Sequence, residues 1–159
     1  MSLFKIIPLS AEFASEIRTN RKDKFGNEVV EQLATGYGPC RVSLNPFIPQ
    51  HDKRLLFSYS PFSIKNAFNQ NGPIFISSEN LKPYSNIYRF PPEIKADKIN
   101  FPLSLIGYSI DQQMVFTQMI GEQDIDELID QILQNNHDIF YLHARNAEAQ
   151  CFICKIERR

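Results

Sequence analysis

The clearest pattern in the chain lies in its C-terminal third, where apolar residues follow the period of an α-helix. Five of them recur at intervals of three and four residues: Ile125, Leu128, Ile129, Ile132 and Leu133. The acids of this segment gather near its N-terminal end, where the helix dipole favours negative charge. The pattern predicts an amphipathic helix near residues 123–134.

Two pairs of strands flank this helix. Residues 101–110 and 114–120 are rich in strand-forming residues and are separated by three polar residues, which indicates a hairpin. Residues 138–145 and 150–157 flank a second short turn in the same way. The predicted order of the C-terminal elements is therefore β-β-α-β-β.

The N-terminal part begins with a predicted strand over residues 3–7, which Pro8 ends. Ser10 then has the character of a helix N-cap, and apolar residues at helical spacing follow it as far as Asn20. We therefore expect one short N-terminal helix.

Further strands are predicted at residues 54–60, where apolar side chains alternate, and at residues 74–76. Residues 28–35 fit a helix or a strand equally well, and the Pro-containing residues 81–100 predict a long ordered loop. Strands in sequence with few helices predict an α+β fold on a largely antiparallel sheet. No boundary interrupts residues 1–159, which are expected to form a single domain.

Composition and charge narrow the class of protein. The chain has 159 residues, 43% of them hydrophobic, and a formal charge of −1, which argues against disorder and against a surface that coats nucleic acid. No run of about 18 apolar residues and no apolar N-terminal leader is present. Three cysteines are an odd number, unlike the paired set of a small secreted protein. We therefore predict a cytoplasmic protein with no membrane partner and no nucleic-acid partner; its oligomeric state stays open.

The three cysteines, Cys40, Cys151 and Cys154, together with His143 form a chemically legitimate zinc set. The residues between Cys151 and Cys154 are bulky and favour a strand, on which positions three apart face opposite ways. This spacing disfavours both a zinc knuckle and a redox motif at a helix start. The alternative is that Cys154 is an ordinary buried cysteine, and we predict no bound metal.

Tyr141, His143 and Arg145 alternate onto one face of a predicted strand, opposite Phe140, Leu142 and Ala144, which are expected to lie in the core. A phenol, an imidazole and a guanidinium on one face suit an anionic ligand. The alternative is a solvated face on which Arg145 pairs with Glu148 or Glu157.

Cys40 and Arg41 follow two glycines and a proline. If Cys40 were a nucleophile, Arg41 would favour its thiolate and His143 would serve as the base. The alternative is a turn that carries a buried cysteine. The surrounding residues match no phosphate-binding loop.

Several of these segments occur in an order that resembles a family of small uncharacterised bacterial proteins, a domain of unknown function. The segments are Gly38-Pro39-Cys40-Arg41, Ser58-Tyr59-Ser60-Pro61-Phe62, Gly72-Pro73-Ile74-Phe75, His143-Ala144-Arg145-Asn146-Ala147 and Cys151-Phe152-Ile153-Cys154. The resemblance implies a bacterial cytoplasmic protein of one domain and implies no activity.

The leading functional hypothesis is a binding module for a small anionic ligand. Its site would contain Arg41 and Arg145 as charge clamps, His143 and Tyr59 as orienting donors, and Asn146 beside them. A cysteine-dependent enzyme that uses Cys40 and His143 is the first alternative, and a zinc-stabilised interaction protein is the second.

Overall fold

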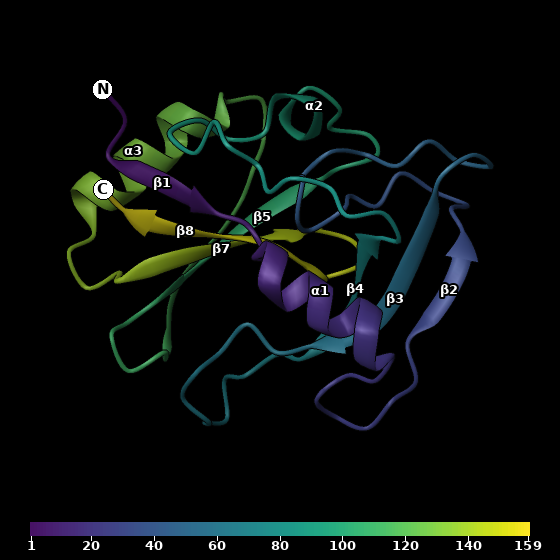
Figure 1. Cartoon of the computed structure of the whole chain (residues 1–159). Helices are drawn as coiled ribbons and strands as arrows, with labels where there is room; N and C mark the ends of the chain where they lie inside the picture. The colour runs from purple at the N-terminus through teal and green to yellow at the C-terminus, as the bar shows by residue number, and fades with distance from the viewer.

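The computed structural model describes residues 1–159 and contains two antiparallel sheets, one of five strands and one of three (Figure 1). The five-stranded sheet has the order β1-β8-β7-β5-β6, and the three-stranded sheet the order β2-β3-β4. The strands are β1 (Phe4–Ile7), β2 (Val30–Leu33), β3 (Lys53–Tyr59), β4 (Gly72–Ser77), β5 (Leu103–Tyr108), β6 (Met114–Met119), β7 (Tyr141–Asn146) and β8 (Phe152–Arg158). The helices are α1 (Ala11–Asn20), α2 (Pro92–Lys95) and α3 (Ile125–Asn135). This confirms the predicted α+β class.

Helix α3 forms where the apolar periodicity predicts it. Its five periodic apolar residues are all buried and contribute to a core of 19 residues between α3 and the five-stranded sheet. The carboxylate of Asp124 accepts hydrogen bonds from the amides of Asp126 and Glu127, which begin the first turn. The same carboxylate pairs with Lys95 of α2 at 3.0 Å, so one side chain both caps α3 and joins it to α2.

Replacing this cap should weaken the start of α3 measurably. We expect Asp124→Ala to lower the free energy of unfolding by about 1 kcal/mol, because two amides of the first turn lose their acceptor. Asp124→Asn keeps an oxygen that can accept these hydrogen bonds but loses the charge. It should therefore lower the free energy of unfolding by only a few tenths of a kcal/mol, because exposed ion pairs contribute little. Urea unfolding of both variants measures the difference. Equal losses would show that the ion pair, and not the cap, is what matters.

The C-terminal order β-β-α-β-β is confirmed. β5 pairs with β6, and β7 pairs with β8 and with β5, all antiparallel. β1 then adds to the outer edge of β8, with Phe4 opposite Arg158. The first and the last strands of the chain therefore lie side by side (Figure 1).

The N-terminal elements build a second core. The Ser10 hydroxyl accepts a hydrogen bond from the amide of Phe13 and caps α1 as predicted. Ala14 and Ile17 of α1 join a buried cluster of 12 residues, most of which come from the three-stranded sheet and residues 40–47. The ambiguous residues 28–35 contain a strand, β2, and the expected loop over residues 81–100 is interrupted by the short helix α2. None of the helices has the length and apolar character needed to cross a membrane.

The two sheets meet where β4 lies against β8. One face of the five-stranded sheet carries α3, while the other is covered by the segment that connects β3 to β4, residues 60–71, and by aromatic residues of the N-terminal half. This second face of the sheet carries the polar side chains of β7.

Candidate functional site

Tyr141, His143 and Arg145 do alternate onto one face of β7, but this face lies inside the protein. His143 is completely buried and Arg145 is only 3% exposed, whereas Phe140, expected in the core, is 54% exposed. The alternative of a solvated face, on which Arg145 pairs with an acidic residue, is therefore wrong, and so is the expectation that Phe140 lies in the core. The physical reason is that residues 60–71 fold across the sheet, with the ring of Phe62 centred 5.2 Å from that of His143.

This covering segment is held in place by the turn between β5 and β6. The side-chain oxygen of Gln112 accepts hydrogen bonds from the amides of Ser63 and Ile64. The side chain of Asn66 donates to the carbonyl groups of Asp111 and Gln112. The cover is therefore fixed by specific polar contacts, and it buries His143 on the second face of the sheet.

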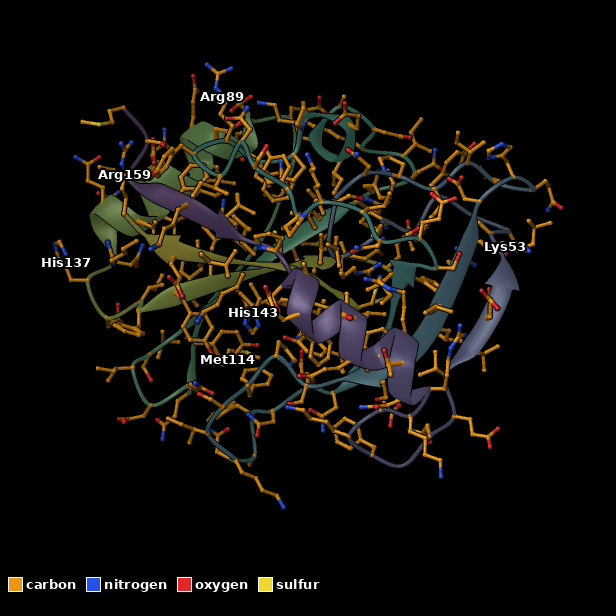
Figure 2. All side chains as sticks on the ribbon, in the orientation of Figure 1. Lys53, Arg89, Met114, His137, His143 and Arg159 are labelled. Atoms are coloured by element: carbon orange, nitrogen blue, oxygen red, sulfur yellow. The ribbon has the colours of Figure 1, made fainter.

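His143 occupies an aromatic cage in the middle of the molecule (Figure 2). The centres of four rings lie 4.8–5.2 Å from the centre of the imidazole: those of Phe62, Tyr108, Tyr141 and Phe152. Neither ring nitrogen has a hydrogen-bond partner. Burial, together with the positive charges of Arg145 and Lys155, lowers the pKa of His143 well below its usual value, so the ring is neutral.

The environment of His143 bears directly on its proposed role as a base for Cys40. No hydrogen bond joins the imidazole to that thiol or to any other group. The Cys40 sulfur instead accepts a hydrogen bond from the amide of Ser77 at 3.3 Å. The structure therefore does not bring the two residues of the predicted dyad into contact.

Arg41 is fully buried and reaches from the segment before β3 to the start of β8. Its guanidinium donates to the carbonyl groups of Phe152 and Pro39 and, through Nη2, to the Cys151 sulfur at 3.2 Å. Cys151 lies 110 residues away in sequence. Burial lowers the pKa of Arg41, and negative charge on Cys151 is the largest influence that raises it.

Arg145 is the second buried guanidinium of this region. It donates to the carbonyl group of Gln150 at 3.1 Å and more weakly to that of Gln70 at 3.5 Å, while its Nε has no partner. None of the ion pairs in the structure includes Arg41 or Arg145. Burial lowers the pKa of Arg145 as well. Both cations therefore lack a carboxylate partner.

A cavity of about 290 Å³ lies beside these groups, between the start of β4 and the turn that joins β7 to β8. Its lining residues are Gln70, Asn71, Gly72, Pro73, Arg145, Ala149, Gln150, Cys151 and Phe152. No acidic residue is among them. We call this space the Arg145 cavity; it contains a buried cation and a half-buried thiol, Cys151.

The remaining predicted site residues lie elsewhere. Cys40 lines a separate cavity with residues 43–53 and 77–81. Tyr59 lines another, where its ring packs against Phe13 and Phe152. The Asn146 side chain accepts hydrogen bonds from the amides of Glu148 and Ala149, and so shapes the turn that leads to Cys151. Of the predicted binding residues, only Arg145 lines the Arg145 cavity, and Arg41 contacts its lining residue Cys151.

The predicted zinc candidates Cys40, Cys151, Cys154 and His143 do not converge. No group of three or more His, Cys, Asp or Glu side chains is arranged to hold a metal ion. Cys154 is completely buried, and burial raises the pKa of its thiol to about 12. The geometry therefore gives a zinc-stabilised protein no support.

Two other arginines, Arg54 and Arg158, have contacts typical of a structural role. The guanidinium of Arg54 lies 3.8 Å from the centre of the Phe75 ring, which provides a cation–π contact, and it bonds to Gln32. Arg158 donates to the carbonyl groups of Leu133, Asn136 and Ile139. These groups lie at or just after the C-terminal end of α3, where the helix dipole favours a cation. Arg41 and Arg145 have neither an aromatic face nor a helix end to offset their charge.

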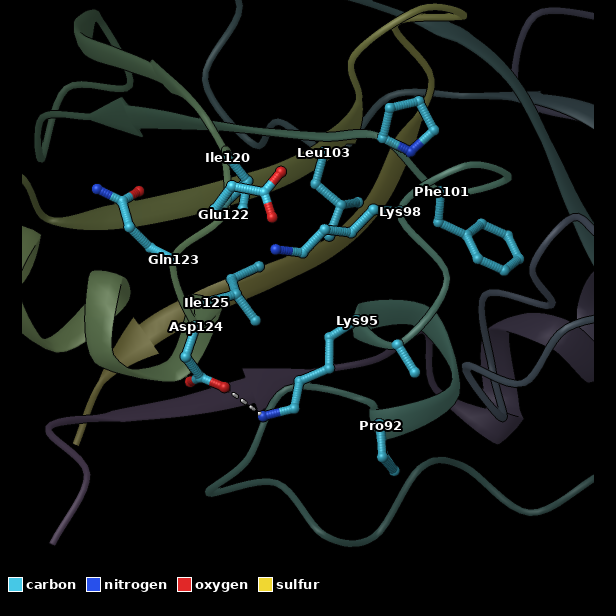
Figure 3. A pocket seen from close by; sticks show the side chains of 12 residues that line it. Pro92, Lys95, Lys98, Phe101, Leu103, Ile120, Glu122, Gln123, Asp124 and Ile125 are labelled. Atoms are coloured by element: carbon cyan, nitrogen blue, oxygen red, sulfur yellow. Dashed lines mark hydrogen bonds and ion pairs between the residues drawn. The ribbon is translucent and has the colours of Figure 1, made fainter.

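A further cavity, of about 510 Å³, lies between α2 and the start of α3 (Figure 3). Its walls are largely apolar, with Leu103 and Ile125 among them. Two of the charged groups at its edge have partners: Lys95 pairs with Asp124, and Lys98 donates to the Gly121 carbonyl. None of its lining side chains carries a buried polar atom without a partner, so this cavity gives no evidence of a ligand.

The contact between Arg41 and Cys151 is not among the sequence-based predictions. The sequence analysis links Arg41 to its neighbour Cys40, and it considers Cys151 only as a metal ligand or as part of a redox motif with Cys154. No local pattern links positions that are 110 residues apart. The one sequence signal that bears on the contact is that no acidic residue occurs between Glu31 and Asp52, the segment that contains Arg41.

Fold and cavity together define an α+β protein of two antiparallel sheets, with a small cavity in which a buried guanidinium lies near a thiol. The chain belongs to the family described as "Protein of unknown function (DUF1203)", whose model matches residues 37–158. This match confirms the family resemblance that the motifs indicated. No curated protein and no solved structure matches the chain.

Proposed function

We propose that the protein binds a small anionic ligand in the Arg145 cavity. The observation that supports this most strongly is the Arg145 side chain itself: a guanidinium that is 3% exposed, has no carboxylate partner and lines a cavity without acidic residues. We also propose a cytoplasmic location, because its three cysteines are free and thiols stay reduced in that compartment.

The energetic argument concerns the cost of a buried charge. Taking a guanidinium out of water costs several kcal/mol unless a counter-charge lies nearby. Two carbonyl groups offset only part of this cost for Arg145, and its Nε donates to nothing. An anion in the cavity would supply the missing counter-charge and accept charge-assisted hydrogen bonds.

The cavity also limits the size of the ligand. A volume of about 290 Å³ lies at the lower end of the range for small-molecule sites. Gln70 and Asn71, whose side chains are neutral amides, are among its lining residues. These features fit a compact carboxylate or oxyanion, and a nucleotide would be too large.

Binding of malonate, with phosphate and sulfate for comparison, tests the proposal. Isothermal titration calorimetry in a chloride buffer of constant ionic strength should detect saturable binding to the wild-type protein. Arg145→Met removes the cation at similar side-chain length and should weaken binding at least about 10-fold, since loss of one partner of a buried charge pair costs about 2–5 kcal/mol.

Lys24→Met is the matched control, because it also removes one positive charge but from an exposed residue far from the cavity in sequence. Its affinity should equal that of the wild-type protein. Circular dichroism of each variant verifies that it is folded. Binding of equal strength in Arg145→Met, or no anion binding by the wild-type protein, would refute the proposal.

A further inference from the structure

The side chain of Cys151 differs from the other two thiols in exposure and in its partner. It is half-buried and lines the Arg145 cavity, whereas Cys40 and Cys154 are buried. We propose that Cys151 is a nucleophilic thiol that exchanges with small carboxylate-bearing disulfides in this cavity. This inference rests on the proposed anion site, because Arg145 is what selects a negatively charged partner.

Arg41 provides the first reason why this sulfur is reactive. The thiolate is the nucleophilic form of a cysteine, and a neighbouring cation favours it. The Arg41 guanidinium lies 3.2 Å from the Cys151 sulfur, and its other two contacts are neutral carbonyl groups. The Cys151 sulfur is therefore the only hydrogen-bonded partner of this buried guanidinium that is able to carry a negative charge.

The second reason is the cavity. Arg145 is more than nine-tenths buried, has an unpartnered Nε, and lines the same space as Cys151. A carboxylate held by Arg145 would bring the rest of its molecule close to the sulfur. Holding two reactants together in this way raises the rate of their reaction.

The other cysteines cannot substitute for Cys151. The thiol of Cys154 is completely buried, and because burial raises its pKa to about 12 it stays protonated at neutral pH. Cys40 is almost completely buried, and its sulfur accepts a hydrogen bond from a backbone amide. All three cysteines are free, so the exchange partner of Cys151 comes from outside the chain.

The proposed step needs no reagent beyond the disulfide. The Cys151 thiolate attacks one sulfur of the disulfide, and a new sulfur–sulfur bond forms as the original one breaks. The departing sulfur leaves with the electron pair of the broken bond and takes a proton from water. Cys151 ends as a mixed disulfide, with the carboxylate of the retained half beside Arg145, and a second thiol reverses the reaction.

Two small disulfides of opposite charge test the inference: anionic 3,3′-dithiodipropionate and cationic cystamine. Mass spectrometry of the intact protein and of its peptides measures how fast each forms a mixed disulfide at Cys151, relative to its rate with N-acetylcysteine amide. We expect the relative rate with dithiodipropionate to exceed that with cystamine by at least about 10-fold, as complementary charge commonly achieves. Arg145→Met should abolish this preference.

Cys151→Ser should abolish the modification, whereas the matched control Cys40→Ser should leave its rate unchanged. If Cys151 reacts with both disulfides no faster than N-acetylcysteine amide while malonate still binds, the thiol inference is overturned and the anion site stands. Equal relative rates with the two disulfides would overturn the choice of an anionic partner, and so would modification of Cys40 or Cys154 in place of Cys151.

Discussion

The wild-type protein is expected to lose stability steeply as the pH falls below about 6.5, and His143→Phe is expected to lose it less steeply. His143 is neutral in the folded protein because burial, Arg145 and Lys155 lower its pKa. In the unfolded chain it takes up a proton with the usual pKa of about 6.5. The unfolded state therefore binds more protons below this pH, and the free energy of unfolding falls as the pH decreases.

The size of the effect follows from the linkage between protons and folding. One proton taken up only on unfolding changes the free energy of unfolding by about 1.4 kcal/mol per pH unit. Between about pH 6.5 and 4.5 the wild-type protein should therefore lose about 2–3 kcal/mol more than His143→Phe, whose ring fills the aromatic cage without titrating. Urea unfolding at several pH values measures this difference.

The matched control is His137→Phe, because the imidazole of His137 is exposed to solvent. This variant should keep the wild-type pH dependence. The same pH slope in the wild-type protein and in His143→Phe would show that the aromatic cage admits a proton, and would contradict the prediction.

Gly38→Ala should destabilise the protein more than the loss of the α3 cap does. Gly38 has a φ of 85°, and a Cβ on it would clash with Cδ2 of the Phe47 ring. An L-residue in the left-handed region costs about 1–2 kcal/mol, and forcing an extra carbon into a packed core costs about 1–3 kcal/mol. We expect a loss of about 2–5 kcal/mol in the free energy of unfolding.

Gly36→Ala is the control for this substitution, since an added Cβ there meets nothing within 4 Å. Its stability should stay within about 0.5 kcal/mol of the wild-type value. Gly38 precedes Pro39, whose carbonyl group accepts a hydrogen bond from Arg41. A shift of this segment should move Arg41 relative to the Cys151 sulfur, so Gly38→Ala should also slow the reaction of Cys151 with dithiodipropionate. Thermal denaturation of Gly38→Ala near the wild-type midpoint would contradict the predicted clash.

Elements with a strong local pattern were predictable from the sequence. The apolar stripe of α3, its acidic first turn and the two C-terminal hairpins all follow from residues that are close in sequence. β2 was ambiguous because it is a short strand with mostly exposed residues, so its pairing with β3 decides its conformation. α2 was missed because a single turn that starts at Pro92 has too few residues to show periodicity.

The candidate site was predictable only in part, for a related reason. Alternation along β7 correctly grouped His143 with Arg145, because successive side chains of a strand point to opposite faces. Alternation cannot indicate what covers a face, and the covering residues 60–71 belong to a distant part of the chain. The sequence indicated Cys40 as the thiol partner of Arg41 because the two residues are adjacent. In the structure the Arg41 guanidinium contacts the Cys151 sulfur instead.

The pairing of β1 with β8 also sets an order of events during folding. Because synthesis proceeds from the N-terminus, Phe4 leaves the ribosome 154 residues before its partner Arg158. Arg41 likewise has no acceptor at Phe152 or Cys151 until β8 has emerged. Contacts of such long range slow folding, whereas the β7–β8 hairpin can close locally. We therefore expect this hairpin to form before the N-terminal segments pair with it and to serve as the template on which they assemble.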